Sequence, residues 1–344
     1  AELWPDYPGH ALRPTASHQA NQQAATYLYV KHLYTKQSKK IEARGCQMTS
    51  KGVDVSDLKQ ILGVFGPGST HWVGDGFHVR NLFPSNGVSN EISPFLMLDY
   101  AGPTKVPPSE RPRGVDEHPH RGFETVTIAY QGAVEHRDSG GNAGTIGPGD
   151  VQWMTAASGV VHEEKHQRDF AKQGGTFEMV QLWVNLPRAY KMSPPRYQTL
   201  LREQIPTAEL GPAGYARVIA GEFGGLKGPA RTFTPVTVLD VRLNGGTTAE
   251  LTLPAGHNSA LVLLKGDVAV NASQQLKGEA RLALLSPGGE RIQLDVKQDT
   301  VLLVLSGEPI NEPVASYGPF VMNTRAEVMQ AVADYQAGKM GHLQ

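Results

Sequence analysis

The chain has 344 residues, of which 40% are hydrophobic and 19% charged, and this is enough for two domains of ordinary size or one large β domain. Its 32 lysines and arginines nearly balance its 33 aspartates and glutamates, so the composition argues against a nucleic-acid-binding surface and against an acidic disordered chain. The single cysteine, Cys46, excludes a disulfide framework and a cysteine-based zinc site within one chain and favours a cytoplasmic protein, and no apolar run approaches the roughly 20 residues that span a bilayer.

The first 47 residues differ from the rest of the chain. Residues 1–47 show no sustained hydrophobic period, and their charges are mainly basic. Met48 then begins a stretch that looks like an ordinary N-terminus. We therefore expect residues 1–47 to be a leader or a poorly ordered extension, and the alternative is a basic arm that contacts a partner.

From His71 onward the sequence consists of short apolar runs separated by turns rich in Gly, Pro, Asn and Asp. Such runs recur at a spacing of roughly 8–12 residues, which is typical of a β-sandwich or barrel. The pattern becomes irregular after about residue 187, and a second β stretch with similar turns follows. We predict an N-terminal β barrel at 48–190, a linker at 191–231 and a second β barrel at 232–344.

The C-terminal end of the second region carries a helix signal. Thr324 can cap the helix, and Glu327 three residues later completes a capping box. The helical pattern continues to about Ala337, before Gly338. We therefore expect a short helix at the end of the second barrel.

The segment EHPHRGFET contains the residue types that bind metals. Side chains two positions apart on a strand share a face, so His118, His120 and Glu124 can point the same way. The same alternation lets His162 and Glu164 share a face in the segment GVVHEEKH. Imidazole and carboxylate ligands of this kind suit Fe(II), Mn, Ni, Cu(II) or Zn. One strand can thus supply half of a metal site, and a second strand must supply the rest.

A His-x-His pair alone is a weak signal, but here a second motif follows it. The segment GVVH, which ends at His162, comes after a Pro-Gly-Asp turn at 148–150. In this order the two segments resemble the two motifs of the cupin superfamily, the first running from Gly114 to Gly132 and the second from Gly144 to His162. The pair of motifs predicts a metal site between neighbouring strands of the first barrel.

The segments HPHRGFETV, PGDVQWMTA, GVVHEE, QLWVNLP and GEPINEPVASYGPFVMNT resemble the signature segments of the pirin family. The resemblance extends from about residue 66 to the C-terminus. It implies an all-β fold of two tandem cupin (jelly-roll-like) β-barrels with a short C-terminal helix. It also implies one mononuclear metal in the first barrel, with Fe(II) the expected ion and Mn, Ni, Co, Cu or Zn as alternatives. The implied ligands are His118, His120, His162 and Glu164.

Other acidic and imidazole side chains lie near these motifs, and we do not expect them to be the main metal ligands. By strand alternation Glu163 should point away from the metal, and Glu124 is the alternative carboxylate ligand, which we expect to orient a histidine instead. His136 and His166 are expected to be solvated or to support the ligands. The second barrel has only His257 at the corresponding place, so we expect it to be structural or to contribute a lid.

The resemblance extends to enzymes similar to quercetin 2,3-dioxygenases, oxidoreductases that open a flavonol ring with O2. A carboxylate would take a proton from a flavonol hydroxyl, and the flavonolate and O2 would bind at the metal, with Glu164 the expected base and Glu124 the second choice. The alternative is a non-catalytic iron-binding redox sensor and co-regulator that docks a protein partner. We expect a monomer with a small phenolic substrate, without direct nucleic-acid contact or membrane attachment. The expected pocket residues are Arg121, Gln181, Phe95, Met97, Met154 and Phe177.

Overall fold

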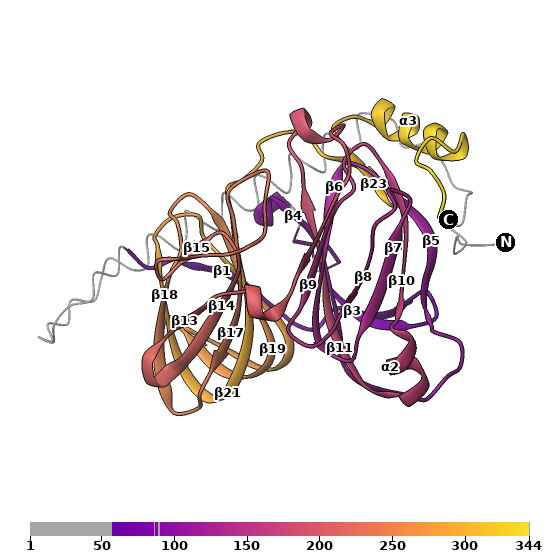
Figure 1. Ribbon diagram of the computed structural model, residues 1–344. Helices are drawn as coiled ribbons and strands as arrows, with labels where there is room; N and C mark the ends of the chain where they lie inside the picture. The colour runs from indigo at the N-terminus through magenta and orange to yellow at the C-terminus, as the bar shows by residue number, and fades with distance from the viewer. Residues whose placement is uncertain (1–56, 86, 89, 344) are drawn as a thin grey trace, which may run out of the picture. The chain divides into compact units, whose positions relative to one another are not determined.

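The computed structural model describes residues 57–85, 87–88 and 90–343 (Figure 1). The extension predicted at residues 1–47 lies outside the described residues. Strands dominate the described part, and its two α-helices are α2 (Arg168–Gln173) and α3 (Arg325–Gln336). Neither helix has both the length and the apolar character that crossing a bilayer requires. The predicted all-β architecture with a C-terminal helix is confirmed.

Two sheets form the N-terminal β domain, and their side chains alternate between faces as the sequence pattern predicts. The larger sheet has the order β12 (Arg196–Leu200), β9 (Val151–Thr155), β6 (Phe123–Gln131), β11 (Gly175–Asn185), β4 (Phe95–Val106), β3 (Phe77–Phe83) and β2 (Thr70–Val73). The smaller sheet has the order β5 (Gly114–His120), β10 (Val160–His166), β7 (Val134–Asp138) and β8 (Ala143–Ile146).

One eight-stranded sheet forms the second β domain. The sheets of both domains are open rather than closed barrels, and they are consistent with the cupin jelly-roll fold. The sheet of the second domain has the order β1 (Ile61–Phe65), β20 (Gln274–Leu285), β19 (Asn258–Val270), β21 (Arg291–Gly307), β17 (Val236–Leu243), β14 (Gly214–Ala220) and β13 (Thr207–Glu209). Its eighth strand, β18 (Thr247–Thr252), pairs with β21. Strands β15 (Glu222–Phe223) and β16 (Leu226–Lys227) form a separate hairpin.

The segment 191–231, which the sequence analysis treats as a linker, forms strands instead. β12 pairs with β9 of the first domain, and β14 pairs with β17 of the second. Prolines at 194 and 195 and several glycines interrupt the apolar pattern, which conceals these short strands from a periodicity argument. β1 likewise precedes the strands of the first domain in the chain but pairs with β20 of the second. Strand pairing therefore crosses both predicted domain limits.

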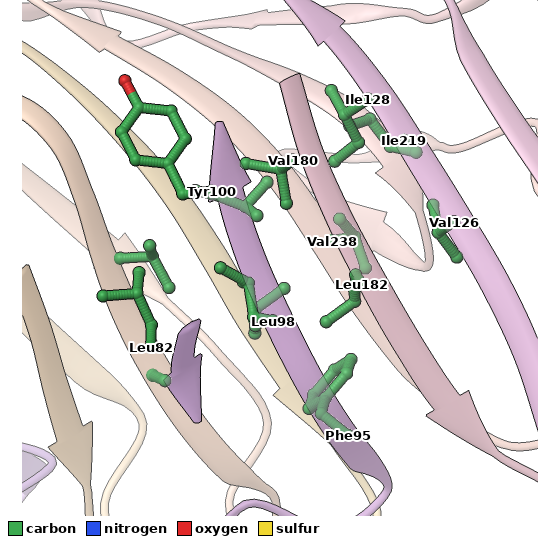
Figure 2. Close-up of a cluster of buried hydrophobic side chains, with 14 of the residues drawn as sticks. Leu82, Phe95, Leu98, Tyr100, Val126, Ile128, Val180, Leu182, Ile219 and Val238 are labelled. Atoms are coloured by element: carbon green, nitrogen blue, oxygen red, sulfur yellow. The ribbon is translucent and has the colours of Figure 1, made fainter. Parts of the chain in front are cut away.

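One apolar core joins the two domains. It combines Leu98, Val126 and Val180 of the first domain with Ile219 and Val238 of the second, and all five side chains are fully buried (Figure 2). Burying an aliphatic side chain of this size contributes about 1.5–3 kcal/mol. The large sheet of the first domain thus has one face toward this shared core and the other toward its own interior.

The chain returns to the first domain after β21. We call residues 309–336 the return segment, and it contains β22 (Ala315–Tyr317), β23 (Phe320–Met322) and α3. Thr324 accepts a hydrogen bond from the amide of Glu327, whose carboxylate accepts one from the amide of Thr324, so the predicted capping box is confirmed. Phe320, Met322 and Val328 pack with Val161 of β10. The helix therefore covers the first domain, although the sequence analysis assigns it to the second.

Candidate metal centre

Three histidines converge where β5 and β10 pair. His118 lies opposite His162 in the antiparallel register, and His120 lies opposite Val160. His118 and His120 share a face because they are two positions apart on β5. One nitrogen of each of the three rings lies within 4.8 Å of the others, and among the described residues this is the one group of three or more such side chains that could hold a metal ion.

Backbone carbonyls fix the orientation of the two β5 rings. His118 donates from Nδ1 to the carbonyl of Asp116 at 2.8 Å, and His120 donates from Nδ1 to the carbonyl of Pro319 at 3.4 Å. A carbonyl can only accept, so each ring carries its proton on Nδ1 and keeps a lone pair on Nε2. The contact to Pro319 also shows that the return segment orients one of the three histidines.

The third ring is buried and offers a free nitrogen. His162 is fully buried, and its Nε2 has no hydrogen-bond partner. Burial lowers the pKa of His162 well below its ordinary value, and repulsion from any proton charge on the neighbouring histidines lowers it further. Burial is also the main cause that lowers the pKa of His118 and His120. Neutral rings with free lone pairs are the form that binds a metal, so the three donors fit a divalent ion.

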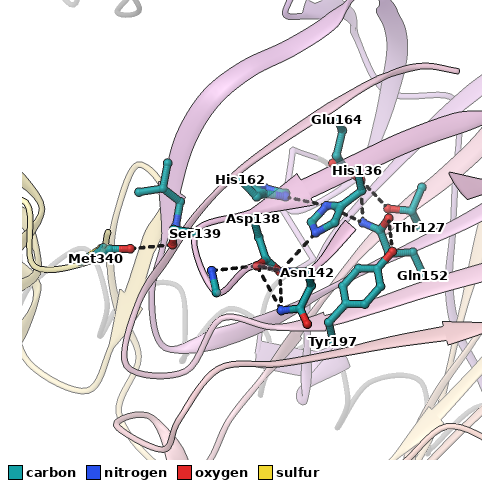
Figure 3. Close-up of polar contacts among 12 residues, drawn as sticks. Thr127, His136, Asp138, Ser139, Asn142, Gln152, His162, Glu164, Tyr197 and Met340 are labelled. Atoms are coloured by element: carbon teal, nitrogen blue, oxygen red, sulfur yellow. Dashed lines mark hydrogen bonds and ion pairs between the residues drawn. The ribbon is translucent and has the colours of Figure 1, made fainter. Parts of the chain in front are cut away.

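Glu164 lies two positions after His162 on the same face of β10. It is 5% exposed, and its Oε1 accepts hydrogen bonds from Thr127 (2.9 Å) and Gln152 (3.1 Å) (Figure 3). Gln181 donates to Oε2 at 3.5 Å. The carboxylate is not part of the three-histidine group. Its role as a fourth ligand stays a prediction. Glu163 points away from the three histidines, as expected, because its carboxylate pairs with Arg137 at 2.5 Å.

Glu124 does not face the three histidines, and the expectation that it shares their face is wrong. Its Oε1 accepts a hydrogen bond from Thr155 at 2.6 Å. It shares parity on β6 with Val126, which faces the core between the domains, while Thr127 faces Glu164. β5 ends at His120 and β6 begins at Phe123, so the turn between them resets the alternation that the sequence argument counts through.

Two of the expected pocket residues lie beside the centre. Gln181 on β11 contacts Glu164 directly, as described above. Met154 on β9 has the same parity as Gln152, which also contacts Glu164. Met154 packs with Tyr197, a ring at the edge of the same interior. Contact of either side chain with a substrate stays a prediction.

The other four expected pocket residues have different neighbours. Phe177 stacks on Phe77 at 5.4 Å in a separate apolar cluster, and Phe95 belongs to the core between the domains. Met97 lines a cavity of about 550 Å³ together with Phe95, Trp183 and part of the return segment. The guanidinium of Arg121 is bound to the carbonyl of Ser158 at 2.6 Å and to Asp334 of α3 at 2.8 Å. Their expected contact with the metal pocket is therefore not supported by their positions.

His136, for which the sequence leaves a solvated and a supporting position open, lies next to the centre. His136 on β7 is 1% exposed and contacts His162, Gln152 and Asp138 (Figure 3). The signal was available, because Val134, His136 and Asp138 alternate with charged residues and so mark the inner face of a strand. His136 is therefore buried beside His162, which agrees with a supporting position and not with a solvated one.

The second domain has no comparable arrangement among its described residues. Its interior holds an apolar cluster that includes Leu239, Leu263 and Leu302. His257 forms a 3.4 Å hydrogen bond with the hydroxyl of Ser306. Apolar side chains thus occupy the region that holds imidazoles in the first domain. This agrees with a structural role for the second domain.

Comparisons with known proteins agree with the fold. Residues 76–184 match the Pirin family profile, and residues 238–341 match the Pirin C-terminal cupin domain. A Pseudomonas aeruginosa protein named "Putative quercetin 2,3-dioxygenase" is 56% identical over 82% of this chain and 98% of its own. A tomato (Solanum lycopersicum) pirin-like protein is 42% identical over 78% of this chain and 88% of its own. The crystal structure of an Acinetobacter baumannii quercetin 2,3-dioxygenase has a TM-score of 0.81 and 50% identity, and covers 83% of this chain and 100% of that one.

Proposed function

Because this chain belongs to the pirin family, we propose that it is a metal-dependent dioxygenase of the quercetin 2,3-dioxygenase kind, with Fe(II) as its metal and a flavonol such as quercetin as its substrate. The observation that carries the proposal is the convergence of three imidazole nitrogens within 4.8 Å inside the domain that the relatives share. The names of the two dioxygenase relatives support the substrate class.

The ligand set proposed for the metal is His118, His120, His162 and Glu164. Three neutral imidazoles and one carboxylate suit several divalent ions, so Mn, Ni, Co, Cu and Zn are alternatives to Fe(II). A bound ion of this set would polarise a phenolic oxygen, and a redox-active one such as Fe(II) would also supply the redox capacity that chemistry with O2 requires. His118 is the one partly exposed member of the three histidines, so the proposed substrate approaches past this ring.

Glu164 is the proposed base. A general base must lie within hydrogen-bond reach of the proton that it removes, and Glu164 is the carboxylate in the interior beside the histidines. Thr127, Gln152 and Gln181 hold the carboxylate in one orientation, so it can accept a proton from a flavonol hydroxyl without first having to be ordered. Glu124 is too far removed in orientation for this role, because it lies on the face of β6 that meets the core between the domains.

Turnover of quercetin tests the proposal. The protein, reconstituted separately with Fe, Mn, Ni, Co and Cu, is mixed with quercetin without oxygen and then exposed to air. The proposal predicts loss of the flavonol absorbance that requires both the metal and air. Absence of turnover with every metal would refute it.

The regulatory alternative makes a different prediction in the same experiment. Several relatives carry only the name pirin or pirin-like protein, which states no enzymatic activity. A non-catalytic iron-binding sensor would bind the metal without consuming quercetin, and its affinity for a protein partner would differ between Fe(II) and Fe(III). Equal partner affinity in the two oxidation states would exclude this alternative.

A further inference from the structure

His162 is oriented in a different way from the other two histidines of the centre. The Nδ1 atoms of His118 and His120 are each tied to a backbone carbonyl. The Nδ1 of His162 contacts a side chain instead, the Nδ1 of His136, at 3.4 Å. Two imidazole nitrogens can share a hydrogen bond only if one donates and the other accepts. The direction of this bond therefore decides which nitrogen of His162 is free for a metal.

We infer that Asp138 and His136 are positioning residues that hold the proton of His162 on Nδ1, so that its Nε2 lone pair faces the metal. The inference rests on the proposed metal centre. It assigns a role to two side chains that contact neither the metal nor the substrate. Both side chains are buried, at 5% and 1% exposure respectively.

The hydrogen bonds around Gln152 fix the direction of the contact. Its Nε2 donates to the carboxylate of Glu164 at 3.1 Å, and its Oε1 accepts from the hydroxyl of Tyr197 at 3.3 Å. The same Nε2 lies 3.2 Å from Nδ1 of His136 and donates its second hydrogen there. Nδ1 of His136 is therefore an acceptor, and its single lone pair is shared between the Gln152 amide at 3.2 Å and the Nδ1–H of His162 at 3.4 Å (Figure 3).

Asp138 keeps His136 in the matching tautomer. Oδ2 of Asp138 accepts from Nε2 of His136 at 3.3 Å, so the His136 proton resides on Nε2. Oδ1 accepts from the amides of Gly140 (2.8 Å) and Asn142 (3.1 Å), which hold the carboxylate in place. Burial opposes ionisation of Asp138, but these hydrogen bonds outweigh it and lower its pKa, so the group is a carboxylate at neutral pH.

The network also connects the histidine to the proposed base. A single amide group, that of Gln152, donates to both His136 and Glu164. The ring of Tyr197 stacks on His136 with centroids 4.7 Å apart and planes 15° apart, which restricts rotation of the imidazole. The orientation of His162 and that of Glu164 thus depend on one set of side chains from β7, β9 and β12.

Asp138→Asn is the variant that reverses the donor and acceptor roles in the hydrogen bonds from Asp138 through His136 to His162. The backbone amides of Gly140 and Asn142 select the oxygen of the new side chain at the Oδ1 position. The Asn142 side-chain NH2, which donates to both oxygens of Asp138 at 3.0 Å, must turn away before the new NH2 group can face Nε2 of His136. The His136 proton then moves to Nδ1, where it opposes the Nδ1–H of His162. His162 must place its own proton on Nε2, which blocks the lone pair that a metal needs.

Co(II) affinity and its visible absorption spectrum provide the readout, since both report on the ligands rather than on turnover. We expect Asp138→Asn to bind Co(II) about 10- to 100-fold more weakly than the unaltered protein, which is the usual effect of removing a group that orients a metal ligand. The matched control is Asp150→Asn. Asp150 also accepts backbone hydrogen bonds in a turn, from Gly147 and Arg202, but it contacts no histidine.

Two substitutions of His136 keep the test informative if Asp138→Asn fails to fold. His136→Asn places an amide oxygen near the former Nδ1 and can still accept from His162, so we expect affinity close to that of the unaltered protein. His136→Phe retains a ring against Tyr197 but offers no acceptor, so we expect the 10- to 100-fold loss. Nitrogen-15 shifts of the His162 ring in the metal-free protein check the tautomer directly.

The outcomes separate this inference from the proposed function. Equal Co(II) affinity and equal spectra for Asp138→Asn and Asp150→Asn would overturn the inference and leave the metal centre intact. If the pair had a purely structural role, its variants would lower the stability of the metal-free protein, but His136→Asn and His136→Phe would bind Co(II) with equal affinity. That result would also overturn the inference. Failure of the unaltered protein to bind Co(II) at all would overturn both the metal centre and the inference.

Discussion

Replacing Glu124 by glutamine should stabilise the protein at neutral and alkaline pH and leave its metal content unchanged. Glu124 is 1% exposed, and it accepts one hydrogen bond from Thr155 on the face of β6 that meets the core between the domains. Burial raises its pKa from the ordinary 4.5 to about 7, although the hydrogen bond from Thr155 opposes the rise. A neutral amide of the same shape retains an acceptor for Thr155 and has no charge to bury.

The expected magnitude follows from the two pKa values. Between pH 4.5 and about 7 the folded protein holds a proton on Glu124 that the unfolded chain releases, so the stability contributed by this group falls as the pH rises. The loss is complete above about pH 7, and the difference between the two values corresponds to about 3 kcal/mol. Glu124→Gln should therefore exceed the unaltered protein by up to about 3 kcal/mol at pH 8 and by little at pH 4.5.

Urea unfolding of the metal-free proteins at both pH values measures this gain. Glu163→Gln is the matched control, because Glu163 lies outside the interior and pairs with Arg137. The control removes a carboxylate that the fold leaves partly exposed, so it should lack the gain of up to about 3 kcal/mol at pH 8. A Glu124→Gln variant that is no more stable than the unaltered protein at pH 8, or that loses metal, would refute the placement of Glu124 away from the centre.

Three further variants test other parts of the structure. Gly122→Ala should cost about 2–4 kcal/mol of unfolding free energy, because φ is +90° there and a Cβ would lie 1.9 Å from the carbonyl oxygen of Val321. The control Gly246→Ala, at φ +79° with nothing within 4 Å of the added Cβ, should cost only about 1 kcal/mol. Equal losses of the two variants in urea unfolding would count against the close contact at Gly122. Glu164→Gln should lower quercetin turnover at least about 100-fold while the three histidines still retain metal, and full activity in a steady-state assay would exclude Glu164 as the base. His257→Ala should leave the metal content per chain unchanged, so a lower content by elemental analysis would point to a second site.

Part of the metal centre could be predicted from the sequence because it lies within continuous strands. His118 and His120 share one strand, and the alternation of His162, Glu163 and Glu164 on the next strand is as the parity rule requires. The order of the two motifs indicated that these strands are neighbours. The register confirms this, because His162 lies directly opposite His118.

The same rule fails where the strand is interrupted. Glu124 is an even number of positions from His120, but Arg121 and Gly122 form a turn between β5 and β6. The left-handed φ of Gly122 is available to glycine and disfavoured for other residues, and it reverses the sense of the alternation. A glycine within a run of apparently alternating residues is therefore a reason to restart the count.

Contacts between distant parts of the chain were beyond the reach of a periodicity argument. The carbonyl that orients His120 belongs to Pro319, 199 residues away, and α3 is linked to the first domain through Arg121 and Asp334. No local pattern encodes which domain a terminal helix will cover. The pairing of β1 with β20 is of the same kind.

The metal content of the unaltered protein and of His120→Ala tests the central claim most directly. Both proteins are loaded with Fe(II) without oxygen, separated from free metal and measured by elemental analysis, with circular dichroism to verify the fold. We expect about one iron per chain in the unaltered protein and a sharply lower content in the variant. Equal iron in the two proteins, or none in the unaltered one, would contradict the assignment of the three imidazoles as the metal centre.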